Sequence, residues 1–195
     1  MEKINKKINI LYFINGLGSG GTERHLAELL QSIDKNRINP YLIYYRNDNF
    51  YLNDVNNSGA KVFYIPKRRR DKFLFWRMIL FINAIIKIIK DNGIDLIHSY
   101  GVGSNYWARI IGKLSGRKII ISIRSTRLED RVSSFEKFLS KFDLSSWYIL
   151  EKFLCRLASR VIVNSGAIKE IYSRRTKYDK NKIIVINNGF NLLIK

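Results

Sequence analysis

Apolar positions follow two patterns that alternate along the chain. Short, mostly apolar runs predict strands at 9–14, 41–45, 61–66, 95–99, 118–123, 160–165 and 182–187. Between them, apolar residues recur every three or four positions, which predicts helices at 22–33, 71–90, 105–116, 145–159 and 167–175. Strands that alternate with helices imply βαβ units. We therefore predict an α/β fold, a Rossmann-like three-layer α/β/α domain with a mostly parallel sheet of about seven strands.

Turn and cap residues place some of the boundaries. Pro40 stands before the second strand, so we expect that strand to begin at Tyr41. Ser104 can cap a helix, so we expect the next helix to begin directly after it. The polar, charged stretch 124–143 carries no predicted element.

Composition limits the class of protein. The chain has 195 residues, 46% of them hydrophobic, so it can bury one core and is too apolar for a disordered tail. Its one cysteine, Cys155, excludes an internal disulfide, and no Cys/His cluster has the spacing of a zinc site. A disulfide-stapled secreted domain and a structural zinc module are excluded, and a reducing compartment is favoured.

The net charge indicates an anionic partner. The chain has 35 Lys+Arg against 16 Asp+Glu, a net charge of +19. Nucleic acid, anionic lipid and phosphorylated substrates all suit such a surface. A basic nucleic-acid-binding module is therefore one alternative function, although the basic residues are spread along the chain and no nucleic-acid motif appears.

A glycine-rich loop follows the first predicted strand. Residues 16–21 read GLGSGG, and Gly16, Gly18 and Gly21 satisfy G-x-G-x-x-G directly before a predicted helix. Glycine lets the backbone approach a ligand closely, and the N-terminus of the helix offers unpaired N–H groups to a phosphate. This strand–loop–helix setting makes the pattern more specific than it is alone.

Three interpretations of the loop stay open on this evidence. A dinucleotide-binding Rossmann protein would use Asp48 or Arg46, after the second strand, to contact a ribose or its 2′-phosphate. A second interpretation is a site for the phosphates of a sugar nucleotide or of a phosphorylated acceptor. The third is a tight turn without a ligand.

Four segments together resemble one family. Segment 16–30 (GLGSGGTERHLAELL) is similar to the glycine-rich loop and first helix of the retaining glycosyltransferases of family 4, also called group 1. Segment 95–124 resembles their central strand–helix–strand, and 150–172 resembles their "RLADRVIAVSEALRE" segment. Segment 182–191 (KIIVINNGFN) resembles the end of their N-terminal domain. The four matches follow the family's order and cover most of the chain.

The resemblance implies the GT-B architecture, in which two Rossmann-like domains face a cleft. The N-terminal domain receives the acceptor, and the C-terminal domain holds most of the nucleotide-sugar donor and a pair of glutamates. The chain looks like the acceptor-side domain over residues 1–190, with 191–195 as the start of the interdomain linker. The resemblance leads us to expect that the C-terminal donor-binding domain is absent from this chain, and we expect no activity without such a domain or a separate subunit.

The function implied is transfer of a sugar from a nucleotide-sugar donor to a glycan or lipid-linked acceptor, in the synthesis of cell-surface polysaccharide or glycolipid. The nucleotide sugar is the co-substrate, and the resemblance implies neither a further cofactor nor a metal. No catalytic residue is assigned to this chain. We expect a cytoplasmic protein, peripheral at the inner membrane face, and we do not expect nucleic acid as a partner.

The resemblance also assigns roles to matching positions. Contacts to substrate or phosphate are expected at Gly18, Gly20, Gly21, Glu23, Arg24, His98, Arg124, Asn164 and Ser165. The alternative for His98 is a buried histidine with satisfied hydrogen bonds. The alternative for Asn164 and Ser165 is a cap for the helix that follows them.

Arg124 departs from the family pattern, because many members carry a histidine at this point after the fifth strand. Arginine stays protonated, so it cannot act as a general base. It can bind a phosphate or a carboxylate through two hydrogen bonds. The departure therefore favours an anionic acceptor.

A basic and aromatic segment is the candidate membrane contact. Basic residues beside aromatic ones suit an anionic lipid surface; here they are Lys67, Arg68, Arg69, Arg70, Phe73 and Trp76. Segment 73–89 is too short for a typical transmembrane helix. The alternative is that its regularly spaced isoleucines pack on the sheet. The stretch 124–141 is a second candidate surface.

Overall fold

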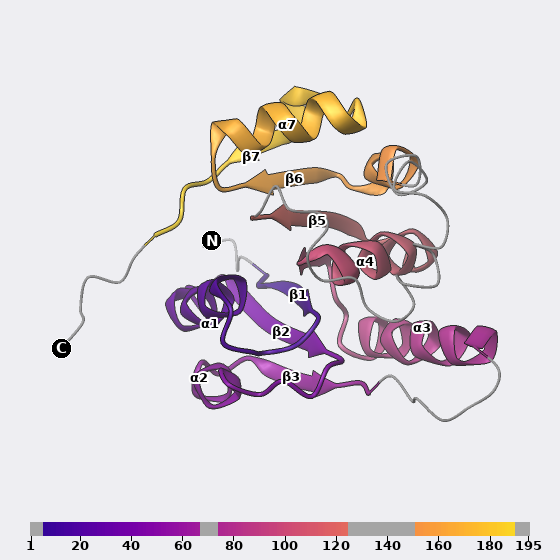
Figure 1. Ribbon diagram of the computed structural model, residues 1–195. Coiled ribbons are helices and arrows are strands. Elements are labelled where there is room, and N and C mark those ends of the chain that lie inside the picture. The colour runs from indigo at the N-terminus through magenta and orange to yellow at the C-terminus, as the bar shows by residue number, and fades with distance from the viewer. Residues whose placement is uncertain (1–5, 67–73, 125–150, 190–195) are drawn as a thin grey trace, which may run out of the picture.

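The computed structural model describes residues 6–66, 74–124 and 151–189, which form one parallel sheet with helices on both faces (Figure 1). The strands are β1 (Ile8–Ile14), β2 (Ile38–Tyr44), β3 (Lys61–Tyr64), β4 (Leu96–Tyr100), β5 (Lys118–Ile123), β6 (Arg160–Val163) and β7 (Ile183–Val185). Their order is β3-β2-β1-β4-β5-β6-β7, and neighbouring strands pair in parallel. The predicted fold class is confirmed.

The described helices connect these strands. They are α1 (Gly21–Ser32), α2 (Leu52–Asn57), α3 (Leu74–Asp91), α4 (Val102–Ser115) and α7 (Gly166–Thr176), with 3₁₀ turns η1 (Cys155–Leu157) and η2 (Lys180–Lys182). The sequence pattern missed α2, because its six residues, LNDVNN, are mostly polar. Of the predicted helix 145–159, only its last residues are described: 151–154 are helical and continue into η1.

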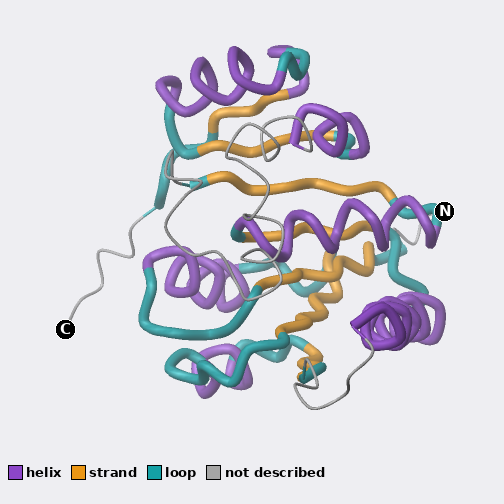
Figure 2. The backbone as a smooth tube through the Cα atoms, turned by 45° about the vertical axis from the view of Figure 1, so that its right-hand side comes forward, coloured by secondary structure: helices purple, strands orange, loops and turns teal. Residues whose placement is uncertain are grey.

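Helices lie on both faces of the sheet (Figure 2), and each face has its own apolar core. α1 and α2 cover one face over β1, β2 and β3, with Leu26 and Leu30 buried in that core. α3, α4, η1 and α7 contribute to the core on the other face, which extends along the sheet to β7. Ile85 and Ile89 of α3 are buried there, so the prediction that the isoleucines of this segment pack on the sheet is confirmed.

Two predicted boundaries are wrong for local reasons. β2 begins at Ile38 and includes Pro40. A proline is tolerated there because it pairs with β1 only, and β3 begins to pair with β2 at Tyr41. α4 begins at Val102 with Gly101 as its N-cap, in the left-handed region at φ 88°. The Ser104 hydroxyl is therefore inside the first turn, where it donates to the carbonyl oxygens of Tyr100 and Gly101.

Within the described ranges, no helix has the length and apolar character needed to cross a membrane.

Candidate functional site

The strand order reverses between β1 and β4, and ligands of open α/β sheets bind beyond the carboxyl ends of the strands at such a point. Asn15, directly after β1, holds three segments together there. Its side-chain oxygen accepts hydrogen bonds from the backbone N–H of Ser104 (2.8 Å) and from the Tyr45 hydroxyl (2.5 Å). Its carbonyl accepts from the N–H of Arg46 at 2.7 Å. The sequence analysis did not select Asn15, because it carries no motif.

The glycine-rich loop packs on the segment that follows β2. A Cβ at Gly16 would lie 3.1 Å from the Cβ of Arg46, and the Leu17 N–H donates to the carbonyl of Asp48 at 2.7 Å. Arg46 and Asp48 form an ion pair with each other at 3.3 Å. The two residues considered for a ribose contact thus hold the loop in place instead.

The N-terminus of α1 follows this loop without a side-chain cap. Its N-cap is Gly20, in extended backbone at φ −80°. The Glu23 carboxylate folds back beside it, so that a Cβ at Gly20 would lie 2.3 Å from Glu23 Oε2. Gly21 has open space around its Cα. An uncapped helix N-terminus with exposed glycine backbone can receive an anion.

Arg24 does not extend into the site. Its Nε donates to Glu28 Oε1 at 2.8 Å, one turn along α1, and both side chains are accessible to solvent. This is an ordinary surface pair at spacing i, i+4. The expected substrate contact of Arg24 therefore gains no support from its position.

His98, on β4, is held in a polar network beside Arg124. Its Nε2 lies 2.9 Å from the Ser122 hydroxyl on β5, and its Nδ1 lies 3.5 Å from the Tyr100 hydroxyl. Burial, followed by repulsion from His25 and Arg124, lowers the pKa of His98 to about 3. The imidazole is therefore neutral at physiological pH: it can donate and accept hydrogen bonds but carries no charge. The alternative of a histidine with satisfied hydrogen bonds fits this geometry as well as a ligand contact does.

His25, the only other histidine in the chain, lies in the same cluster. Its ring centroid is 6.3 Å from that of Tyr100, and the Tyr100 ring is 4.5 Å from His98. Burial and the charge of Arg124 lower the pKa of His25. Sequence analysis missed His25. Its position could have identified it, because it directly follows Glu23 and Arg24 in the predicted first helix, one turn beyond the glycine-rich loop.

Arg124 is the cation at this edge of the sheet. Its guanidinium donates to the side-chain oxygen of Asn188, and its carbonyl accepts from Asn164 Nδ2 at 3.3 Å. Partial burial lowers the pKa of Arg124, but arginine stays protonated in proteins. Asn164 therefore supports Arg124, while its Oδ1 is buried without a hydrogen-bond partner among the described residues.

Ser165 acts as a helix cap. It is the N-cap of α7, and its side chain accepts a hydrogen bond from the Ile168 N–H at 3.3 Å. The alternative stated for this residue is confirmed, and a ligand role for Ser165 has no separate support.

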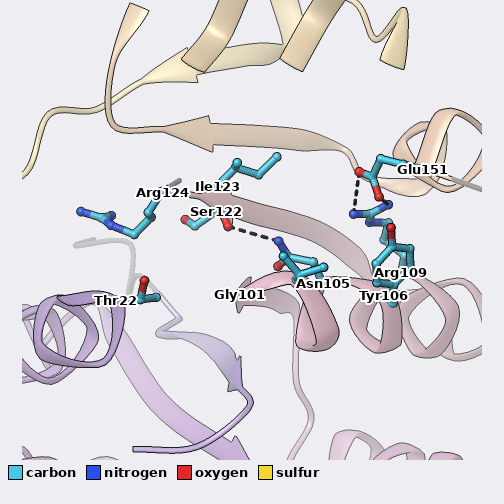
Figure 3. A pocket seen from close by; sticks show the side chains of 10 residues that line it. Thr22, Gly101, Asn105, Tyr106, Arg109, Ser122, Ile123, Arg124 and Glu151 are labelled. Carbon is cyan, nitrogen blue, oxygen red and sulfur yellow. Dashed lines mark hydrogen bonds and ion pairs between the residues drawn. The ribbon is translucent and has the colours of Figure 1, made fainter. Parts of the chain in front are cut away.

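A pocket of about 90 Å³ lies between the start of α1, α4 and the end of β5 (Figure 3). Arg124 and Thr22 stand at one end, and the buried ion pair of Arg109 and Glu151 stands at the other. Between them, Asn105 Nδ2 donates to the Ser122 carbonyl at 3.2 Å. Of the predicted contact residues, only Arg124 lines this pocket. The others lie around it: Gly18 and Gly20 on the glycine-rich loop, Gly21 and Glu23 in the first turn of α1, His98 on β4, and Asn164 directly after β6.

The Arg109–Glu151 pair was not expected from the sequence. Two hydrogen bonds of 2.9 and 3.0 Å join the guanidinium and the carboxylate, and the Tyr172 hydroxyl donates to Glu151 at 2.8 Å. The pair connects α4 with the segment that leads to η1. Because Glu151 neutralises Arg109, Arg124 carries the uncompensated charge among the described residues that line the pocket.

The membrane candidates are only partly described. Lys67, Arg68, Arg69, Arg70 and Phe73 lie outside the described residues. Trp76 is 61% exposed at the start of α3, and the structure adds Phe75 (71%) and Leu80 (58%) beside it. No group of three metal-ligating side chains occurs in the described ranges.

The sheet order and the loop at the switch point define a Rossmann-like domain of the kind that binds nucleotide-linked ligands. The family model of Glycosyltransferase Family 4 matches residues 19–192. The chain therefore belongs to Glycosyltransferase Family 4. No curated protein sequence matches it.

Solved structures share the fold at low sequence identity. HepE of Anabaena, in complex with UDP, is 17% identical with a TM-score of 0.69, over 94% of this chain and 45% of that chain. A glycosyltransferase from Rickettsia africae is 19% identical with a TM-score of 0.66, over 95% and 44%. The lipopolysaccharide outer core galactosyltransferase WaaB is 18% identical with a TM-score of 0.61, over 95% and 47%. The chain spans less than half the length of each.

Proposed function

We propose that this chain is the acceptor-side part of a glycosyltransferase that transfers a sugar from a nucleotide-sugar donor to an anionic glycan or lipid-linked acceptor. Family membership supports the reaction class. Of the similar structures, HepE is solved in complex with UDP, and WaaB is named a galactosyltransferase. The expected product is a cell-surface polysaccharide or glycolipid. Nucleic-acid binding and dinucleotide-dependent chemistry find no comparable support.

One observation carries the proposal. Arg124 brings a cation to the mouth of a pocket whose other charged residues neutralise each other. His98 and His25 beside it have lowered pKa values, so the fixed positive charge is that of Arg124. An acceptor with a phosphate or a carboxylate would place that group at the guanidinium, which can bind it through two hydrogen bonds.

The donor and its leaving group require a second domain. The chain spans under half the length of its solved relatives, so we propose that a donor-binding domain or subunit completes the catalytic cleft. The uncapped N-terminus of α1 would then face the donor phosphates across the cleft, where preorganised N–H donors stabilise developing negative charge. We propose no metal requirement and retention of configuration, as the family resemblance implies.

We also propose peripheral contact with the inner membrane face through the start of α3. Phe75, Trp76 and Leu80 expose apolar surface next to the basic sequence 67–70. Aromatic side chains insert at the lipid interface while basic residues attract anionic headgroups. Such contact would bring a lipid-linked acceptor close to the pocket.

Titration followed by ¹H–¹⁵N NMR tests the acceptor proposal on this chain alone. We expect glucuronate and glucose 1-phosphate to shift the resonances of Arg124, Ser122 and Thr22, and neutral glucose to leave them unchanged. Arg124→Gln should weaken binding of the charged sugars at least 10-fold, which corresponds to loss of a charge-assisted hydrogen bond. Arg37→Gln, an exposed arginine directly before β2 and outside the pocket, is the matched control. Equal effects of charged and neutral sugars would refute an anionic acceptor.

A further inference from the structure

The two histidines of the chain differ in how the protein uses their ring nitrogens. Both nitrogens of His98 face hydroxyl groups, that of Ser122 at 2.9 Å and that of Tyr100 at 3.5 Å. His25 is half-buried, and within the described ranges its ring has no hydrogen bond. It contacts the Tyr100 ring at 6.3 Å between centroids, with an interplanar angle of 45°. The nitrogens of His25 therefore have hydrogen-bonding capacity left for a ligand.

Thr22 shares this property and lies one turn before His25 on α1. Residues three positions apart lie on the same side of a helix, so the two side chains are neighbours. Thr22 lines the pocket, and Figure 3 shows its hydroxyl directed toward the side of the pocket that Arg124 occupies. Among the described residues, this hydroxyl has no hydrogen-bond partner. The α1 side of the pocket therefore presents two neighbouring polar groups that the protein does not use.

The polar groups deeper in the pocket are engaged with one another. Asn105 uses both ends of its amide: its Oδ1 accepts from the Ser99 hydroxyl at 2.7 Å, and its Nδ2 donates to the Ser122 carbonyl at 3.2 Å. Arg109 and Glu151 bind each other through two hydrogen bonds. These groups hold the walls of the pocket in place, and a ligand would meet Arg124 on one side and α1 on the other.

The chemistry of the unused groups specifies a ligand. A guanidinium donates hydrogen bonds and accepts none, so Arg124 suits the oxygens of a phosphate or a carboxylate. A threonine hydroxyl and a neutral imidazole both donate and accept, as a sugar hydroxyl does. Burial, followed by the charge of Arg124, lowers the pKa of His25, and the charge of Glu28 opposes this, so the ring is neutral at pH 7. The pocket mouth thus matches an anion with hydroxyl groups close beside it.

We propose that Thr22 and His25 bind hydroxyl groups of the acceptor next to the anionic group that Arg124 binds. The acceptor is then a sugar whose phosphate or carboxylate has free hydroxyls beside it, and not an anion with apolar substituents. The inference rests on the proposed function for the anionic group. It adds selectivity, because an analogue without hydroxyls leaves the polar groups of α1 without partners.

Pairs of ligands with and without hydroxyls test this inference on the chain itself. Glucose 1-phosphate is compared with cyclohexyl phosphate, and glucuronate with cyclohexanecarboxylate, by ¹H–¹⁵N NMR of the backbone and of the imidazoles. We expect the preferred sugar to bind about tenfold more tightly than its hydroxyl-free analogue, which corresponds to the loss of one or two hydrogen bonds. Only the sugars should shift the ring nitrogens of His25 beyond the effect of charge. The pair with the larger ratio identifies the anionic group.

Variants on α1 assign the preference to its residues. Thr22→Val and His25→Phe keep the shape of each side chain, and each should weaken sugar binding about three- to tenfold without changing the binding of the cyclohexyl analogues. His25→Gln keeps a group that donates and accepts, so it should retain most of the preference, which separates hydrogen bonding from packing. Gln31→Ala, exposed near the end of α1, is the matched control.

The outcomes distinguish failure of this inference from failure of the proposed function. Equal binding of the sugars and their cyclohexyl analogues, with both dependent on Arg124, would overturn the inference and leave the anionic site intact. A preference for the sugars that persists in Thr22→Val and in His25→Phe would also overturn it, because other groups would then bind the hydroxyls. Failure of all four anions to bind would refute the anionic acceptor itself and the inference with it.

Discussion

His98 illustrates how burial sets the chemistry of one side chain. The sequence placed this residue at the end of a strand and left two roles open. In the structure its ring bonds to Ser122 and lies beside Arg124, and its pKa is about 3. A histidine that stays neutral cannot supply charge stabilisation at pH 7. It can act only as a neutral hydrogen-bonding group, toward Ser122 or toward a ligand.

This lowered pKa predicts a specific pH dependence of stability. Unfolding returns His98 to a pKa near 6.5, so the unfolded chain binds a proton that the folded chain rejects between pH 6.5 and 3. The free energy of unfolding should therefore fall as the pH drops below 6.5. From pH 6.5 to 5.0 we expect the His98 contribution to amount to about 1–2 kcal/mol.

Urea denaturation at several pH values measures this dependence. His98→Gln should lose the His98 share of the slope and keep the share of His25, whose pKa is also lowered. NMR of the two imidazoles gives a direct check, since His98 should not titrate above pH 5. A His98 resonance that titrates near pH 6.5 would contradict the prediction.

At the scale of elements, α4 connects the pocket to the core. Gly112 lets this helix lie directly on β5, because a Cβ there would come within 2.3 Å of Ile119 Cγ1. At the pocket end, Arg109 of the same helix binds Glu151 in a buried pair. Close packing and a buried ion pair thus fix the position of α4. That position lets Asn105 of α4 donate a hydrogen bond to the carbonyl of Ser122.

Replacing Gly112 should strain this packing. Ile119 is a buried core residue and cannot move freely, so we expect Gly112→Ala to lower the free energy of unfolding by about 1–3 kcal/mol despite alanine's better helix propensity. The matched control is Gly166→Ala, at the start of α7, where a Cβ meets nothing within 4 Å. Thermal and urea unfolding compare the two; equal stability would show that the helix can shift without cost.

The buried ion pair should behave as a unit. Arg109→Met leaves Glu151 charged and buried, and Glu151→Met does the converse for Arg109, so each should cost about 3–5 kcal/mol. The double change Arg109→Met with Glu151→Met should recover part of that loss, because no buried charge remains. Urea unfolding of the four proteins completes the cycle. Additive losses in the double variant would show that the two residues do not interact.

At the scale of the whole molecule, charge and exposed apolar surface point outward in several places. The +19 net charge has no single explanation in the sequence. The structure separates a cation at the pocket from the exposed aromatic start of α3. Each location matches a different anionic partner, and only the last suits a membrane.

Liposome flotation tests the membrane contact. At low salt, the chain should float with vesicles rich in phosphatidylserine, because anionic headgroups attract basic residues. It should not float with neutral vesicles. Phe75→Ser combined with Trp76→Ser should reduce bound protein about tenfold or more, since both side chains are exposed. Phe50→Ser is the control, because Phe50 is 68% exposed and lies after β2. Equal binding of all variants would exclude α3 as the contact.

The sequence by itself determined the fold class and the chain order of the strands and of the longer helices. Runs such as KIIISI and the spacing of Leu26, Leu29 and Leu30 depend only on which residues must be buried. It did not reveal α2, whose residues are polar and whose helix forms against α1. It also placed Pro40 and Ser104 at boundaries, where the neighbouring strand and the turn at Gly101 decided otherwise.

For the site, the sequence could select the strand ends but not their partners. Arg124 was selected because it stands after the fifth strand, where many members of the family that the sequence resembles carry a histidine, and the structure places it at a pocket. Two features arise only when distant segments meet: the pairing of Arg109 with Glu151, 42 residues apart, and the contact of His25 with Tyr100. Hydrophobic periodicity is a local property of the chain, whereas pairing, pKa and exposure depend on tertiary neighbours. That difference is why the sequence determined the elements and only the folded structure decided the site.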